Sequence, residues 1–163
     1  MSLGAMRLDM LGVPFATADG RLVVYAKAHA ALVAYTPYMI EETKQTQIID
    51  GVTTIEGDVV TKACDAIASV PRQYGVPQRD YVADDIAELQ CGGPGKMFVD
   101  NQSGAILDTS WLKLIPGTST ILGQLDGAAE TVNSIARSCE AMNSATDAVI
   151  NVQFIPRAKV VNT

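Results

Sequence analysis

Short apolar runs separated by turn residues make up most of this chain. The runs are rich in Val, Ile, Leu and Tyr, and Asp-Gly, Gly-Asp, Gly-Gly, Ser-Gly and Pro-Gly steps stand between them. Closely spaced turn signals with short apolar runs between them are typical of β proteins. The pattern predicts a mainly β fold, namely a compact barrel-like or sandwich-like domain with short helical turns.

The clearest strand is expected near the C-terminus, over residues 148–155, where apolar and polar residues alternate. Alternation at period two places Val149, Asn151 and Gln153 on one face and Ile150, Val152 and Phe154 on the other.

A hairpin is expected near the N-terminus. Asp19-Gly20 lies between two apolar runs, and both residue types tolerate the positive φ angles of a type I′ turn.

Further strands are predicted along the middle of the chain. They cover residues 36–41, 74–78, 86–91, 96–100, 106–115 and 120–125. The Gly-Gly-Pro-Gly sequence at residues 92–95 is expected to turn the chain between two of them. The stretch containing Trp111 reads as a strand with that side chain buried.

Four segments have less regular patterns. Residues 28–33 are alanine-rich and suggest one helical turn, whereas residues 42–58 are polar and suggest an excursion over the surface. Residues 58–70 fit a helix or strands. Residues 135–142 fit helical spacing and also tolerate a strand.

Composition narrows the possible functions. The 163 residues carry a net charge of −6, so binding to nucleic acid or to anionic membranes through a cationic surface is not expected. The sequence contains no run of eighteen apolar residues, so no membrane-spanning helix is expected. The first eleven residues lack the apolar core of a signal peptide, so none is expected there. The length suits one β-rich domain, expected at residues 12–156, with an N-terminal arm at 1–11 and a tail at 157–163.

Cysteine and histidine give no support for a metal or redox site. Cys64, Cys91 and Cys139 are widely spaced, without a Cys-x-x-Cys pair. They are interpreted as small, buried, reduced side chains of a protein that is made in a reducing cytoplasm. His29 is the sole histidine and is expected to be structural. We therefore predict neither a metal nor a cofactor.

Candidate catalytic groups are weak. Ser110 and Lys113 match Ser-x-x-Lys, but the Lys-Thr-Gly strand that accompanies that motif in serine enzymes is missing from the sequence. Asp84, Asp85 and Glu88 form the densest acidic cluster and are expected to be a solvated loop. The Gly-rich segment before Lys96 lacks the Ser or Thr of a Walker loop. No catalytic residue is predicted.

Three stretches, in this order and spacing, carry a resemblance to a known family. They are LGVPFATADGRLVVYAKA at residues 11–28, the pair at 74–78 and 86–100 around IAELQCGGPGKMFVD, and the pair at 134–141 and 148–152. Together they resemble the small capsid decoration, or cement, proteins of tailed bacteriophages.

The resemblance implies a non-enzymatic structural protein on the outer surface of an icosahedral virion, made in the host cytoplasm. It implies the major capsid protein and further copies of the chain as partners, with a trimer favoured. It also favours strands at residues 135–142. Several modest contacts made by one symmetric oligomer would add through avidity.

An arm that becomes ordered on the capsid would extend that contact, and we assign it to Arg7, Leu8, Met10 and Leu11, with a frayed terminus as the alternative. The alternative functions are another virion module, such as a head fibre base or a tail-associated β domain, and a small hydrolase using Ser110 or the acidic cluster.

Overall fold

The chain folds almost entirely as β-strands. The computed structural model describes residues 11–49, 52–63, 73–99, 106–107, 109–114, 121–123, 134–142 and 147–156, and these contain strands, turns and bridges but no helix. The predicted mainly β class is therefore confirmed. The described part of the chain has no helix that could cross a membrane. The strands are β1 (Phe15–Ala16), β2 (Leu22–Lys27), β3 (Tyr38–Ile49), β4 (Val52–Ala63), β5 (Gln73–Pro77), β6 (Ile86–Val99), β7 (Trp111–Leu114), β8 (Ile121–Gly123), β9 (Ser134–Ser138) and β10 (Ala148–Phe154).

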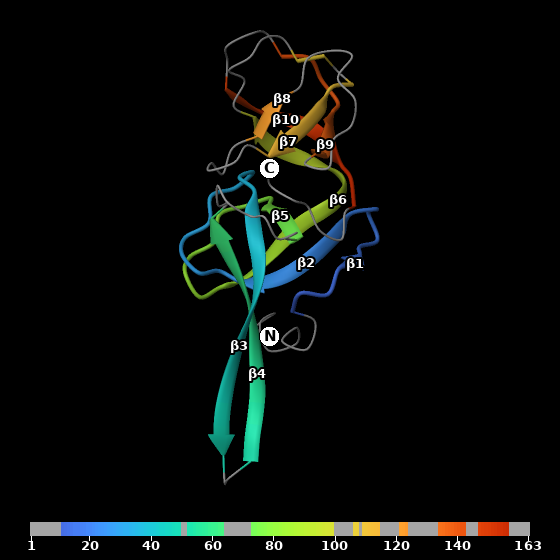
Figure 1. The fold of residues 1–163 in the computed structure, drawn as a ribbon. Helices are drawn as coiled ribbons and strands as arrows, with labels where there is room; N and C mark the ends of the chain where they lie inside the picture. Colours follow the sequence, from blue (N-terminus) through green and yellow to red (C-terminus); the bar gives the residue numbers. More distant parts are fainter. Residues whose placement is uncertain are drawn as a thin grey trace.

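The strands form one continuous, mainly antiparallel sheet in the order β1-β2-β4-β3-β5-β6-β10-β9-β7-β8 (Figure 1). Strand β6 is its centre. Besides its neighbours β5 and β10, β6 also pairs with β2 and, through the single pair Val99↔Ile121, with β8. These two additional pairings fold the sheet back on itself, once on each side of β6.

The folded sheet encloses two apolar cores. The larger core consists of Met39, Tyr74, Val76, Met97, Val99, Ile106, Leu112, Ile135, Ala136, Met142, Ile150, Val152 and Phe154. The smaller core consists of Val24, Ala26, Ala28, Leu32, Tyr38, Ile40, Tyr81, Ala87 and Leu89. On β3, Met39 belongs to the larger core while Tyr38 and Ile40 belong to the smaller one, because successive side chains of a strand point to opposite faces. The base of β3 is thus buried on both faces.

Several expectations about strands are confirmed, since β3, β5, β6, β7 and β8 each overlap a predicted strand. On β10, Ile150, Val152 and Phe154 are buried, and the residues between them are exposed or half-buried, as the alternation predicts. Residues 134–138 form β9, so the strand interpretation of that segment holds over these residues.

The N-terminal hairpin also forms, but with a different turn. Phe15 pairs with Val23 and Ala16 with Leu22. Gly20 has a φ of 82°, whereas Asp19 keeps a negative φ, so the turn is not type I′. The Gly20 N–H donates to the Thr17 carbonyl, which gives a type I turn followed by a left-handed glycine.

Three expectations about the middle of the chain are wrong. Residues 92–95 do not turn the chain but lie inside β6. Residues 28–33 form no helical turn, and Leu32 instead makes an isolated bridge with Tyr81. Residues 42–58 do not run over the surface as an excursion but, where they are described, continue β3 and β4 as paired strands. The open choice at residues 58–70 is a strand up to Ala63, and the rest lies outside the described residues.

Candidate interaction surface

The β3–β4 hairpin projects well beyond the two cores. The strands pair along their whole length, from Tyr38↔Ala63 to Ile49↔Val52. The pairing of β3 with β5 ends at Ile40, and β4 touches β2 through the single pair Lys27↔Val60. Beyond these residues, the two strands pair, within the described chain, with each other alone. Figure 1 shows this ribbon extending away from the rest of the molecule.

A two-stranded ribbon of this kind leaves two edges of backbone N–H and carbonyl groups without a strand partner. Such a ribbon is only marginally stable by itself in water. An exposed strand edge is also a template on which another chain adds a strand. Among the described residues, the projecting ribbon, residues 41–49 and 52–59, is therefore a candidate surface for binding a neighbouring protein.

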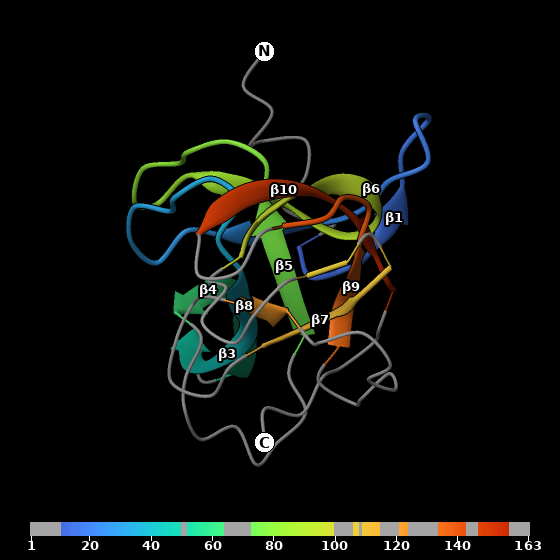
Figure 2. The same ribbon diagram turned by 90° about the horizontal axis from the view of Figure 1, so that it is seen from above.

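Two loops beside the smaller core form a second exposed feature (Figure 2). The loops, residues 28–37 and 78–85, are joined by two backbone hydrogen bonds between Leu32 and Tyr81, at 2.9 and 3.1 Å. Val33 and Val82, each next to one member of this bridge, are 60% and 66% exposed, the highest values among the large apolar side chains of the described residues. We call residues 28–37 and 78–85 together the loop pair.

The acidic residues of the loop pair are structural. Asp84 pairs with Lys27 at 3.0 Å and has a φ of 69°. Asp85 accepts the backbone N–H of Val82 at 3.2 Å, and Asp80 accepts that of Ala34 at 2.8 Å. The predicted solvated loop is confirmed for Asp84 and Asp85, which are exposed, and is wrong for Glu88, which is half-buried on β6. No group of three or more potential metal ligands occurs in the part of the chain that the structure describes.

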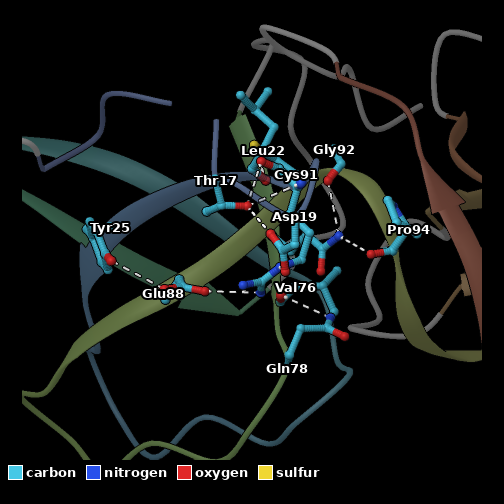
Figure 3. A network of polar contacts seen from close by, with 12 residues as sticks. Thr17, Asp19, Leu22, Tyr25, Val76, Gln78, Glu88, Cys91, Gly92 and Pro94 are labelled. Atoms are coloured by element: carbon cyan, nitrogen blue, oxygen red, sulfur yellow. Dashed lines mark hydrogen bonds and ion pairs between the residues drawn. The ribbon is translucent and has the colours of Figure 1, made fainter. Parts of the chain in front are cut away.

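Glu88, the third member of the acidic cluster, belongs to a separate polar network (Figure 3). Its carboxylate accepts a hydrogen bond from the Tyr25 hydroxyl and pairs with Arg21 Nη1, both at 3.2 Å. Arg21 Nε pairs in turn with Asp19 at 2.7 Å, and Asp19 also accepts a hydrogen bond from Thr17 Oγ1. The hydrogen bond from Thr17 and the one from Arg21 lower the pKa of the exposed Asp19 carboxyl below its usual value.

The remaining candidate groups have structural roles. Ser110 is buried, and its Oγ accepts the backbone N–H of Leu107 at 3.1 Å. Trp111 is half-buried rather than buried, and the Arg137 guanidinium lies 5.1 Å from its ring centre. Exposed His29 contacts Thr61 Oγ1 through its Nδ1 at 2.8 Å, in agreement with a structural role.

The cysteines differ from the expectation of three buried side chains. Cys139 is exposed, because it follows the end of β9 in a bend. Cys91 is half-buried, and burial raises the pKa of its thiol to about 11. Cys64 lies outside the described residues.

Leu11 is the single described residue of the predicted capsid-binding arm. It forms a parallel bridge with Tyr25 and packs against the smaller core. Arg7, Leu8 and Met10 lie outside the described residues, and their contact with a capsid stays a prediction.

Sequence reasoning did not find the ribbon or the loop pair. The ribbon had a signal: residues 42–58 contain many Thr, Ile and Val residues, the β-branched types that favour strands. The loop pair had none, because the bridge between Leu32 and Tyr81 joins residues far apart in the chain.

Comparison with known proteins gives little further information. No protein-family model matches the chain, and no curated protein matches its sequence. Among solved structures, the head fibre gp8.5 N base of bacteriophage phi29 is similar with a TM-score of 0.46 at 10% sequence identity. The match covers 88% of this chain and 99% of that one. A TM-score at this level does not establish a shared fold or function.

Proposed function

We propose that this protein is a non-enzymatic structural component of a bacteriophage virion, a decoration protein that binds the outer face of the head and bridges neighbouring major capsid protein subunits. The observation that carries the proposal is the projecting β3–β4 ribbon. Its two outer edges have no strand partner within the described chain, and edges of this kind are templates on which a neighbouring chain can add a strand.

The sequence resemblance to capsid decoration proteins supports the same function. It extends over residues 11–28, 74–78, 86–100, 134–141 and 148–152, which supply β1, β2, β6, β9 and most of β5 and β10. Except for β1, these strands contribute to the two cores together with β3 and β7, while the ribbon lies outside the resembling stretches. In this proposal, the two cores and their strands are the part that this chain shares with capsid decoration proteins. The ribbon is the part that is specific to the capsid to which this chain binds.

The position of Leu11 is consistent with a second contact through the N-terminal arm. The Gly12 N–H donates to the Tyr25 carbonyl at 2.9 Å, so the chain is fixed to β2 from residue 11 onward. Arg7, Leu8 and Met10 precede this anchored point and are proposed to bind the capsid. Ribbon and arm together would give each copy two attachment points, whose effects multiply.

The test is binding to purified heads of the phage whose genome encodes the chain, prepared without this protein. The key variant shortens the ribbon by joining Glu42 to Val59 through Asn-Gly, which keeps the base pairs from Tyr38↔Ala63 to Glu42↔Val59. The intact protein is expected to sediment with the heads. The shortened protein is expected to lose most of this binding while keeping its unfolding midpoint.

Two outcomes would contradict the proposal. One is that the intact protein fails to sediment with the heads, and the other is that electron microscopy of the virion places the chain on the tail. The second outcome would instead support the alternative of a tail-associated module. Light scattering of the free protein tests the trimer, with an expected mass of three times 17.3 kDa.

A further inference from the structure

An open cavity of about 320 Å³ lies between β2, the start of β6 and the loop that follows β5. Its polar wall is formed by Arg21, Tyr25, Gln78, Arg79, Tyr81 and Glu88. This volume lies at the lower end of the range found for small-molecule sites. The cavity is distinct from the ribbon, and what it binds does not depend on the proposed role in a virion.

Most polar groups of this wall are already bonded to one another. Glu88 accepts the Tyr25 hydroxyl and pairs with Arg21, and its backbone N–H donates to the Tyr81 hydroxyl at 3.0 Å. The Gln78 side-chain amide donates to the Lys96 carbonyl and accepts the Lys96 backbone N–H, each at 3.0 Å. These contacts hold the wall in a fixed arrangement before any ligand arrives.

Arg79 also has a side-chain hydrogen bond with Tyr81, but its guanidinium carries further N–H donors. It is exposed, and its guanidinium carbon lies 4.6 Å from the centre of the Tyr81 ring. Within the described residues, it forms no ion pair with a carboxylate. A guanidinium stacked on a ring keeps its in-plane N–H donors available, and these form a planar fork that matches a carboxylate. Arg21 uses its Nε and Nη1 and has further donors on the same cavity wall.

The residues that line the wall include more cationic than anionic side chains. Two guanidinium groups face one carboxylate, that of Glu88, whereas the whole chain has a net charge of −6. Of the other acids nearby, Asp19 pairs with Arg21 Nε, and Asp80 and Asp85 accept backbone N–H groups. The charges of Glu88 and Asp85 also act on Arg79, so a ligand carboxylate has to compete with them. Ile86 adds an apolar surface for the body of a ligand.

We propose that this cavity binds a single carboxylate group, with Arg79 as its main partner and the remaining N–H groups of Arg21 as the second. Such a carboxylate occurs on the acidic side chain of a protein and on an acidic sugar. The chemistry is the same in both, and the two sources are separated by the choice of probe.

The experiment is an NMR titration of the full ¹⁵N-labelled chain. The probes are N-acetyl-glutamate N-methylamide, methyl glucuronide, their uncharged counterparts N-acetyl-glutamine N-methylamide and methyl glucoside, and inorganic phosphate. Saturable shifts of the amides around Arg79 and Tyr81 are expected with at least one of the two acids and not with the uncharged compounds. The acid that binds more tightly identifies the source of the carboxylate.

Two variants show whether the Arg79 fork is responsible. Arg79→Gln is expected to weaken binding at least tenfold, and Arg79→Lys, which keeps the charge without the fork, to weaken it less. Arg137→Gln is the matched control, because Arg137 also lies over an aromatic ring but is not part of the cavity wall.

Three results would overturn the proposal. They are the absence of saturable shifts with both acids, equal binding of phosphate or of the uncharged compounds, and an equal loss of affinity in the Arg137→Gln variant. The amide spectrum of each variant away from the cavity shows that it remains folded, so a loss of binding cannot be confused with unfolding.

Discussion

The two halves of β6 have the same length but serve different cores. Residues 86–92 pair with β2 and β5, and Ala87 and Leu89 fill the smaller core. Residues 93–99 pair with β10, and Met97 and Val99 fill the larger core. One strand can change partners in this way because its middle is built from Gly92, Gly93, Pro94 and Gly95.

The change of partner occurs at a close backbone approach. Leu22 pairs with Gly92, and Phe154 pairs with the next residue, Gly93. Gly93 has a φ of 81°, and a Cβ placed there would lie 2.4 Å from the Gly20 carbonyl oxygen. A Cβ at Gly95 would lie 2.8 Å from the Phe154 ring. The glycines therefore allow the N-terminal hairpin and β10 to meet on one strand, which couples the two cores. Four predictions test that coupling.

The largest effect is expected from truncating one core residue on each side. Phe154→Ala in the larger core should cost about 4 kcal/mol of unfolding free energy, and Leu89→Ala in the smaller core about 3 kcal/mol, because each leaves a cavity among fully buried neighbours. If β6 couples the cores, the urea midpoint measured by Trp111 fluorescence should equal the midpoint measured by far-UV circular dichroism within each variant.

Trp111 begins β7, whose next residue Leu112 belongs to the larger core, so its fluorescence reports on that side. A Leu89→Ala variant whose fluorescence midpoint stays at the wild-type value, while its circular dichroism midpoint falls, would show that the two cores unfold independently. The exposed Val149→Ala is a suitable control with a small expected effect.

The second prediction compares two glycines with the same backbone conformation. Gly20 and Gly93 have φ angles of 82° and 81°, but a Cβ at Gly20 would meet nothing within 4 Å. Gly20→Ala should therefore cost about 1 kcal/mol, the strain of a left-handed Ala. Gly93→Ala adds a collision with backbone atoms and should cost about 3 kcal/mol.

Thermal unfolding of the two glycine variants under the same conditions measures this difference. Equal losses would mean that the backbones of β6 and the hairpin separate easily, and the close approach would then not be what couples the two cores.

An element of this fold was predictable from the sequence where it is determined by residues close together in the chain, and not where it depends on distant residues. The β10 strand and the hairpin at Asp19-Gly20 follow from neighbouring residues, so local patterns gave them correctly. The Gly-Gly-Pro-Gly segment has the composition of a turn, and its position inside a strand depends on partners distant in the chain, namely Leu22 and Phe154. Local composition cannot report such partners.

The same limit applies to the candidate sites. The ribbon was misread because polar residues in a chain usually indicate a loop, whereas here they belong to two strands that leave the body. The cavity brings together Arg21, Arg79 and Glu88 from three separate segments, and none of them belongs to a recognisable motif. The acidic cluster was recognised, but Glu88 turned out to have partners different from those of Asp84 and Asp85.

The third prediction concerns Gln90, whose side chain bonds the backbone of residues 92–95, where β6 changes partners. This segment is called the bend. Gln90 is 1% exposed, and its Nε2 donates to the carbonyls of Gly92 and Pro94 at 3.0 and 2.7 Å. Its Oε1 has no partner among the described residues, which offsets part of that gain. Gln90→Leu should therefore cost about 1 kcal/mol net.

The matched control for Gln90 is Gln153→Leu, an exposed glutamine of β10 that pairs with Pro94 and whose loss should be near neutral. Urea unfolding compares the two variants. A Gln90→Leu protein as stable as the wild type would mean that the backbone of the bend is held without this side chain.

The smallest effect is expected at the hairpin that lies against the bend. The pKa of Asp19 is lowered in the folded protein from 3.8 by the hydrogen bonds from Thr17 and Arg21. A lowered carboxyl pKa adds stability that is present above the unfolded value and is lost as the pH falls through the folded value. Asp19→Asn should thus lower the melting temperature slightly at neutral pH, and the difference should vanish below the folded pKa. Because Asp19 is exposed, added salt should reduce the difference at neutral pH. If the two proteins differ in melting temperature by the same amount at neutral and at strongly acidic pH, the effect comes from the shape of the side chain rather than from its charge. The ion pairs that connect Asp19 through Arg21 to Glu88 would then contribute nothing to holding the hairpin against β6.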